Sequence, residues 1–283
     1  QIDRREHDRV ARFGEQLGAP HRRDRVSAVE AGAQAARDNK ADRVGVHPVS
    51  LGNAHSLTLL TPPMTTIGII GSGNIGSQLA RAFTALGHDV VIANSRGPAS
   101  LAGLVAEIAD SPRAGTLTAA TVAEAAAAGD LVVLTIPLGK VPSLPRDLFV
   151  GRTVIDTGNY YPQRDGQIPP LDDETTTTVE WVADQFPGGT FVKAFTHIPA
   201  REITDHAQPA GTDGRRALTV HADDEAAKQR VAQLIDAIGF DAVDGGTLAD
   251  SWRIQRDTPG YGPRFTADEL RAKLAEAKRY RDM

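Results

Sequence analysis

The stretch Ile67-Gly68-Ile69-Ile70-Gly71-Ser72-Gly73-Asn74-Ile75-Gly76 places an apolar run directly before a turn with three glycines. A helical pattern of apolar residues follows, and a second apolar run occupies residues 90–93. This order of strand, G-x-G-x-x-G turn, helix and strand suits a dinucleotide pyrophosphate, because the glycines admit a tight turn, close approach of phosphates and helix packing. The helix start also presents free N–H groups to the anion. We therefore predict cofactor binding at Gly71, Ser72, Gly73, Asn74, Ile75 and Gly76; the alternative is an ordinary turn between a buried strand and a helix.

The residues after the second apolar run indicate which dinucleotide binds. An NAD site usually places an acidic residue there, about 20 residues beyond the glycines, to bond the ribose hydroxyls. This chain has Asn94, Ser95 and Arg96 instead. A hydroxyl and a guanidinium bind a 2′-phosphate through charge-assisted hydrogen bonds, whereas a carboxylate would repel it. NADP(H) is thus the predicted cofactor, and the alternative is that Arg96 is a solvated loop residue in a pocket that tolerates either dinucleotide.

The composition excludes several classes of function. The 283 residues are 41% hydrophobic and 24% charged, with a formal net charge of −5, which gives no general basic field for nucleic acid. The absence of cysteine from the sequence excludes thiol catalysis, disulfides and cysteine-ligated zinc. No apolar run approaches the length of a membrane span, and no signal-peptide pattern is visible. We therefore expect a cytoplasmic protein that has no nucleic-acid or membrane partner.

Composition also divides the chain into three parts. Residues 1–63 are rich in arginine and carry no continuous apolar face, and Met64 then precedes the first strand as a start codon would. We expect residues 1–63 to be a disordered or non-native extension; the alternative is a basic arm that binds a partner. Residues 64–246 are the predicted NADP-binding domain, and residues 247–283 form a tail with an aromatic loop and a charged helix.

Strand and helix patterns alternate from residue 66 onward, which is typical of parallel strands joined by right-handed helical crossovers. Residues 131–136 form a continuous apolar run of the kind that is buried on both faces of a parallel sheet. We therefore predict an α/β fold, a doubly wound and mostly parallel Rossmann-type sheet with a small C-terminal appendage.

Thr135, Ile136 and Pro137 end this apolar run. Open α/β sheets bind ligands at the carboxyl ends of their strands, and proline cannot continue a central strand. We predict that the three residues lie along the cofactor toward the nicotinamide ribose. The alternative for Pro137 is a loop proline that merely ends a core strand.

Two further segments follow at the same predicted edge. Asn159 and Tyr160 come directly after the strand expected over residues 153–156, so they are predicted to contact the nicotinamide amide or the substrate. Residues 169–178 are polar and contain prolines. We interpret them as a surface loop, with a lid as the functional hypothesis.

From residue 64 to about residue 250, the chain resembles the NADP-dependent reductases of the deazaflavin coenzyme F-420. The resemblance lies in the glycine turn, in Asn94-Ser95-Arg96, in Leu134-Thr135-Ile136-Pro137, in Lys193-Ala194-Phe195-Thr196-His197-Ile198-Pro199-Ala200 and in Asp223-Asp224 before a helix. It implies hydride transfer between NADPH and a planar deazaflavin, or a flavin, stacked on the nicotinamide, and it implies a homodimer. Such a reaction depends mostly on positioning and exclusion of water. The absence from the sequence of an evident metal-ligand cluster or acid–base dyad agrees with this implication.

His197 and two tail aromatics are the remaining candidates. His197 follows a predicted strand and is the candidate catalytic residue, because it would orient the amide or donate a proton. The alternative is a structural histidine that is hydrogen-bonded under a loop. Trp252 and Tyr261 would supply aromatic surface for a planar ring, or they pack beneath the tail.

Two other functions stay open at this point. The first is reduction of a carbonyl or imine, which requires a proton donor near the nicotinamide; His197 and Tyr160 are the candidates. The second is a non-catalytic NADP sensor that changes its partners when the cofactor binds.

Overall fold

The computed structural model describes residues 65–111 and 115–279. The expectations for residues 1–63 lie outside the described residues and stay predictions. Within the described part, eight strands form one sheet in the order β3-β2-β1-β4-β5-β6-β7-β8. The strands are β1 (Thr66–Ile70), β2 (Asp89–Ala93), β3 (Leu117–Ala119), β4 (Leu131–Leu134), β5 (Thr153–Asp156), β6 (Thr190–Ala194), β7 (Ala217–Ala222) and β8 (Asp241–Asp244).

The pairings confirm the predicted doubly wound, mostly parallel sheet. All of them are parallel except that of β6 with β7. In this strand order the winding reverses between β1 and β4, which is where such sheets open a ligand crevice at their carboxyl ends. β7 runs antiparallel because the chain returns from β6 through residues 195–216, whose only helix is the single turn α7 (Glu202–Asp205), rather than through a full helical crossover.

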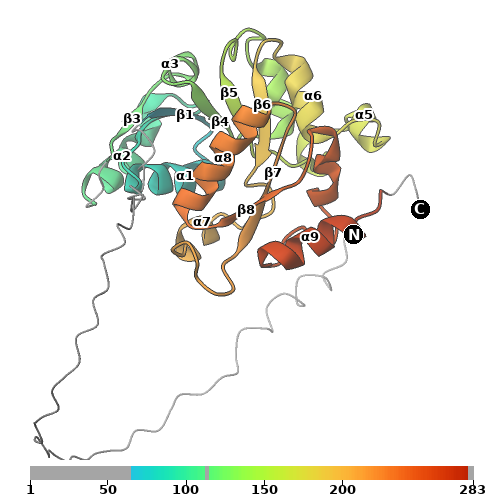
Figure 1. Cartoon of the computed structure of the whole chain (residues 1–283). Coiled ribbons are helices and arrows are strands. Elements are labelled where there is room, and N and C mark those ends of the chain that lie inside the picture. The colour runs from blue at the N-terminus through green and yellow to red at the C-terminus, as the bar shows by residue number, and fades with distance from the viewer. Residues whose placement is uncertain (1–64, 112–114, 280–283) are drawn as a thin grey trace, which may run out of the picture. The chain divides into compact units, whose positions relative to one another are not determined.

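Helices cover both faces of the sheet (Figure 1). On one face, Phe83 of α1 and Val231 of α8 belong to the same apolar core. On the other, Ala125 of α3 and Val182 of α6 belong to a second core. The longer helices are α1 (Asn74–Ala85), α2 (Ala102–Ala109), α3 (Val122–Ala127), α6 (Thr178–Gln185), α8 (Glu225–Ile238) and α9 (Ala267–Glu276); the short turns are η2 (Pro98–Leu101), η3 (Leu138–Ser143), α4 (Pro162–Asp165), α5 (Pro169–Asp172) and η4 (Ala249–Ile254).

The polar stretch 169–178 differs from the predicted surface loop. It begins with the one-turn helix α5, since Pro169 and Pro170 occupy first-turn positions where a missing N–H costs nothing. It ends at the start of α6. There the Thr177 hydroxyl accepts a hydrogen bond from the Glu180 N–H, and the Glu180 carboxylate accepts one from the Thr177 N–H. This capping box ends the loop one residue earlier than expected, because α6 already includes Thr178.

The tail packs on the far strands of the sheet. Ile254 of η4 and Leu270 and Leu274 of α9 form a small apolar core with Ala217 of β7 and Val243 of β8. A capping box of Thr266 and Glu269 starts α9. The predicted boundary at residue 247 stays a prediction, but the tail is held to the sheet by its own core.

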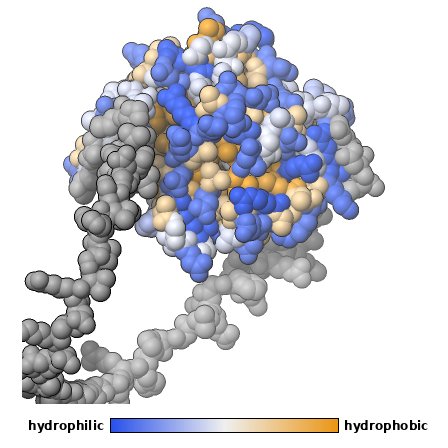
Figure 2. Space-filling model, viewed as in Figure 1, coloured by the Kyte–Doolittle hydropathy of each residue, from blue (hydrophilic) through white to orange (hydrophobic). Residues whose placement is uncertain are grey.

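Figure 2 shows mainly hydrophilic residues on one face, with hydrophobic ones in small areas between them. Among the described residues, Val150, which is 59% exposed, is the only large hydrophobic residue that is mostly open to solvent. None of the helices in residues 65–111 and 115–279 combines the length and apolarity needed to cross a membrane.

Candidate functional site

The glycine turn joins β1 to α1 and has the geometry that the sequence predicts. Gly71 has φ +112°, and a Cβ there would lie 2.2 Å from the Thr135 carbonyl oxygen. A Cβ on Gly76 would lie 1.9 Å from the Gly71 carbonyl oxygen. Gly73, in contrast, has nothing within 4 Å of a built Cβ and begins α1 without a side-chain cap. The first and third glycines are therefore needed by the fold, whereas the second leaves open space and free helix N–H groups for an anion.

Asn94 connects the glycine turn to the loop after β2. Its Nδ2 donates to the Ser72 hydroxyl at 3.0 Å and to the Ser100 hydroxyl at 2.9 Å, and its Oδ1 accepts from the Arg96 N–H at 2.9 Å. The side chains of Ser95 and Arg96 are exposed, and neither makes a hydrogen bond or ion pair with the described residues. Asn94 thus fixes the loop, and the two side chains stay available for a phosphate beside the turn.

A cavity of about 520 Å³ lies at the carboxyl ends of β1, β4, β5 and β6. It brings together most of the predicted site residues, and a further group of predicted residues lies outside it. Those in the cavity lining are Gly73, Asn74, Ile75, Thr135, Ile136, Pro137, Asn159 and His197, together with Tyr261 from the tail. Gly71 and Gly76 are buried in the turn, and the cavity lining does not include Ser72, Asn94, Ser95 or Arg96.

A buried ion pair holds the loop after β5. Lys193 of β6 and Asp156 of β5 are 3% and 2% exposed, and their charged atoms lie 2.7 Å apart. Asp156 also accepts from the Gly158 N–H at 3.0 Å, and Lys193 donates to the Gly158 carbonyl. Asn159 follows directly and donates from Nδ2 to the Thr196 carbonyl at 2.8 Å. The side chain of Asn159 is therefore fixed, with its Oδ1 unbonded to any described residue and available for an amide N–H.

His197 is a buried, neutral histidine. It is 3% exposed, and burial, reinforced by the nearby Arg216, lowers its pKa to about 3. Its Nε2 accepts a hydrogen bond from the Thr219 N–H at 3.1 Å, so the ring proton is assigned to Nδ1. This geometry fits the structural alternative better than a proton donor, because the ring does not carry a spare proton at neutral pH. We therefore assign no acid–base role to His197.

The strand end before His197 is strained. Phe195 is fully buried and adopts φ +58°, a left-handed conformation that is unusual for an aromatic residue. The Thr196 hydroxyl is buried without a hydrogen-bond partner among the described residues. Both residues line the cavity. Strain and an unpaired hydroxyl at a ligand edge are what a binding site concentrates.

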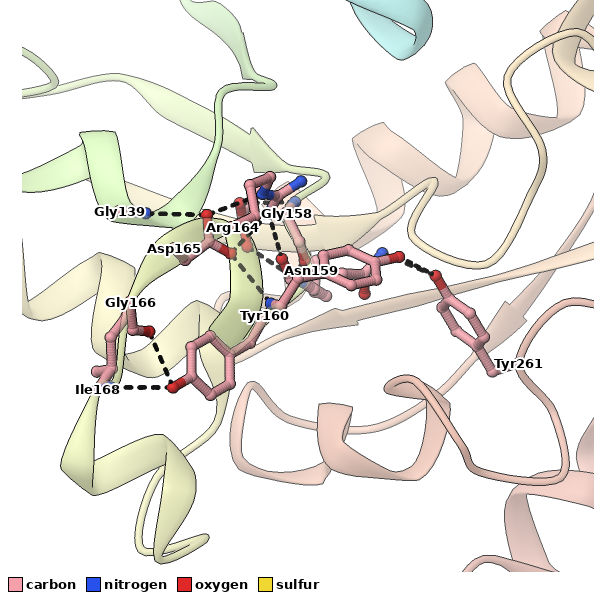
Figure 3. A network of polar contacts seen from close by, with 12 residues as sticks. Gly139, Gly158, Asn159, Tyr160, Arg164, Asp165, Gly166, Ile168 and Tyr261 are labelled. Atoms are coloured by element: carbon pink, nitrogen blue, oxygen red, sulfur yellow. Dashed lines mark hydrogen bonds and ion pairs between the residues drawn. The ribbon is translucent and has the colours of Figure 1, made fainter. Parts of the chain in front are cut away.

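Sequence reasoning missed two side chains that shape this end of the cavity, Tyr161 and Arg164. Tyr161 follows Tyr160, and its hydroxyl oxygen lies 2.9 Å from that of Tyr261. Arg164 of α4 stacks 4.8 Å from the Tyr161 ring centre and donates to the Asn159 carbonyl at 2.8 Å. Figure 3 shows Tyr261 directed at this group of residues from a separate segment of the chain. The signal in the sequence was the aromatic pair after β5, but the partner 100 residues away was not visible there.

A second cavity of about 450 Å³ adjoins the first, and Asn159 lines both. Its walls include Tyr160, Trp252, Arg256 and Arg279. The Tyr160 hydroxyl is bonded to Asp172 at 2.7 Å and to the Ile168 N–H at 2.9 Å, and Trp252 is stacked by two arginines. Tyr160 and Trp252 thus line this second cavity, whereas Tyr261 lines the first.

The fold and the site together are those of a Rossmann-type, dinucleotide-binding α/β domain. A family profile described as "NADP oxidoreductase coenzyme F420-dependent" matches residues 66–160. The hypothetical protein SMa0349 from Sinorhizobium meliloti has a solved structure that is 33% identical, covers 72% of this chain and 96% of its own, and has a TM-score of 0.59. A protein from Arthrobacter sp. FB24, proposed to be an F420-dependent NADP reductase, is 27% identical over 65% of this chain and 86% of its own, with a TM-score of 0.54.

Among curated proteins, the metalloreductase STEAP3 of Rattus norvegicus is 27% identical over 191 residues. The match covers 67% of this chain but 35% of that protein, so the chain spans about a third of the length of this relative. The chain belongs to the family that this profile describes, the coenzyme F420-dependent NADP oxidoreductases.

Proposed function

We propose that the protein transfers a hydride between NADP(H) and a planar deazaflavin of the coenzyme F-420 type, or a flavin. The observation that carries the proposal is the cavity that runs from the open start of α1 to the aromatic residues after β5 and in the tail. Family membership supplies the redox chemistry, and the cavity supplies one place where two rings can meet. A dinucleotide that lies along this cavity would present its nicotinamide near Asn159 and Tyr261.

The residues of this chain act by binding and alignment. The open N–H groups after Gly73 hold the pyrophosphate, and Ser95 and Arg96 bind the 2′-phosphate. Asn159 accepts the carboxamide N–H, and Ile136 lines the cavity with apolar surface that excludes water. When bound, NADPH supplies the hydride, so the protein needs to position two rings rather than to activate a nucleophile.

The acceptor part of the proposal is tested by mixing the full chain with NADPH and an oxidised deazaflavin. We expect the visible absorbance of the acceptor to fall in step with oxidation of NADPH. The same assay is run in parallel with a free flavin and with a ferric chelate. It shows whether the deazaflavin is reduced faster than a flavin and faster than the metal acceptor that the name of the metalloreductase suggests. Tight NADPH binding without reduction of the deazaflavin or the flavin would reject the proposal and favour a cofactor sensor.

A carbonyl or imine is the second candidate acceptor. The observation in its favour is the pair of tyrosine hydroxyls in the cavity, since these substrates need a proton together with the hydride. Turnover of a carbonyl or cyclic imine in the absence of any deazaflavin turnover would establish this alternative.

We also infer a homodimer acting in the cytoplasm on a small-molecule acceptor, without a nucleic-acid or membrane partner. The resemblance to the deazaflavin reductases supports the dimer. Light scattering on the purified chain measures its mass directly, and a monomer at micromolar concentration would contradict the inference.

A further inference from the structure

The loop that carries Tyr261 is fastened to the cavity. Arg216 of the segment before β7 is 1% exposed, pairs with Glu202, and donates from Nη2 both to the His197 carbonyl at 3.2 Å and to the Gly262 carbonyl at 3.3 Å. Gly260, on the other side of Tyr261, is buried against Ile254. The tail loop is therefore held in register with the strand end that lines the cavity, and Tyr261 is a fixed part of its wall.

The hydroxyl groups of Tyr161 and Tyr261 form an incomplete hydrogen-bond network. Their oxygens lie 2.9 Å apart, and Asn159 Nδ2 lies 3.4 Å from the Tyr261 oxygen. An amide N–H can only donate, so the Tyr261 oxygen accepts from Asn159. Two O–H groups share one bond between them, and neither has another acceptor among the described residues. One O–H hydrogen is thus left over, and it belongs to Tyr261 when Tyr161 donates.

Burial keeps this hydrogen on Tyr261 at neutral pH, and two nearby cations offset part of the cost of losing it. Burial raises the pKa of Tyr261, so the phenol is protonated at neutral pH. The guanidinium carbons of Arg164 and Arg256 lie 4.8 Å and 5.3 Å from the centre of the Tyr161 ring. Two cations beside the pair stabilise a transient negative charge on it, although Asp165 and Asp257 offset part of their effect.

We propose that Tyr261 gives its hydroxyl proton to the acceptor as the hydride arrives, with Tyr161 as the positioning residue that donates to the phenolate oxygen. A C–H bond of the reduced nicotinamide breaks and its electron pair forms a C–H bond on the acceptor. A nitrogen or oxygen conjugated to that carbon takes the proton of Tyr261, which is then replaced from water. This inference rests on the proposed function and defines the acceptor class as one that takes a hydride and a proton together.

The test compares Tyr261→Phe with Tyr161→Phe. The control is Pro263→Ala, a substitution of an exposed residue in the same loop that leaves both hydroxyls in place. In single turnovers with NADPH and the acceptor that the wild type reduces, we expect Tyr261→Phe to lower the rate about 100-fold and Tyr161→Phe about 10-fold. Pro263→Ala should stay near the wild-type rate. NADPH affinity, measured by calorimetry, should change by less than about threefold in every variant, since a neutral hydrogen bond to the ring end contributes little to dinucleotide binding.

A second readout does not depend on turnover. In protein labelled with carbon-13 at the tyrosine Cζ, the Tyr261 resonance, assigned as the one missing from Tyr261→Phe, should shift when oxidised deazaflavin is added to the NADP⁺ complex. A wild-type rate in Tyr261→Phe overturns the inference while leaving the proposed function intact. If the wild type reduces none of the acceptors, the proposed function fails. The role of Tyr261 is then tested by its resonance, and the absence of a shift at saturating deazaflavin overturns that role.

Discussion

Two regions of the molecule build the cavity in opposite ways. The phosphate region, residues 71–76 and 94–100, is made of a glycine turn and a loop that Asn94 ties together. The transfer region comprises residues 157–165, 195–200 and 258–262. Its side chains come from segments as much as 100 residues apart. The first exposes backbone N–H groups and depends on sequence-local geometry, whereas the second depends on a buried ion pair, a strained strand end and a clamped tail loop.

The difference teaches where function is adaptable in this fold. A backbone cradle for phosphates tolerates little change, because Gly71 and Gly76 have no room for a Cβ. Single substitutions can change which groups the transfer region presents to a ligand, provided that the ion pair of Lys193 and Asp156 is kept. We expect cofactor choice to reside in the phosphate region and acceptor choice in the transfer region.

The largest effect is expected from breaking the support of the transfer region. Lys193→Met removes the partner of Asp156 and leaves a carboxylate buried without compensation, so the free energy of unfolding should fall by about 4 kcal/mol. Urea unfolding followed by circular dichroism measures this loss. The double variant Asp156→Asn with Lys193→Met removes both charges and should recover a large part of it; a single variant as stable as the wild type would contradict the assigned role of the pair.

Acid should destabilise the fold through two buried histidines, His197 of the transfer region and His221 of β7. Burial lowers the pKa of His197 to about 3 and that of His221 to about 4, from 6.5 in an unfolded chain. The unfolded state therefore binds protons that the folded state does not bind. The contribution of each histidine to the free energy of unfolding is fully present above pH 6.5 and is lost progressively toward pH 4. Each histidine contributes a slope of up to about 1.4 kcal/mol per pH unit.

Urea midpoints measured between pH 7 and pH 4.5 give this slope directly. The variant His221→Leu should show a clearly shallower slope than the wild type, whatever its absolute stability. His88, directly before β2, also has its pKa lowered by burial and accounts for a remaining part. Stability that does not change over this range would mean that the buried rings are not held neutral.

Arg96→Ala is expected to act on the phosphate region alone. Loss of a charge-assisted bond to the 2′-phosphate should weaken NADPH binding by about 2 kcal/mol, which is roughly 30-fold, and leave NADH binding unchanged. Calorimetry with both dinucleotides measures the preference. Arg164→Ala, which alters a cation of the transfer region, is the matched comparison and should keep the preference for NADPH; an unchanged preference in Arg96→Ala would place the 2′-phosphate elsewhere.

The smallest effect is expected for Asn159→Ala. Loss of one neutral hydrogen bond to the carboxamide should weaken NADPH binding by about 1 kcal/mol. Binding of 2′-phospho-ADP-ribose, which lacks the nicotinamide, should stay the same in the same titration. Equal weakening of both ligands would show that Asn159 supports the whole cavity rather than the nicotinamide end.

These two regions also differ in how far the sequence predicted them. Three local patterns carried the prediction: the glycine turn, Asn94 in place of an acidic residue, and the apolar run before Thr135. The sheet and the family predicted from them were confirmed. The position of Tyr261 beside Tyr161 was not predictable, because it depends on Arg216, a residue without a motif, holding the tail loop. His197 drew attention as a motif residue, but its chemistry depends on burial and on the Thr219 N–H, which only the structure shows.

The central claim is that a hydride passes directly between NADPH and the acceptor in the cavity. It is tested most directly with NADPH carrying deuterium at the transferred C4 position, mixed with the protein and the oxidised deazaflavin in ordinary water, and followed by mass spectrometry of the acceptor. The account predicts that the deuterium appears on the reduced acceptor within one turnover. Reduced acceptor that carries only solvent hydrogen, or no reduction while NADPH is bound, would contradict it.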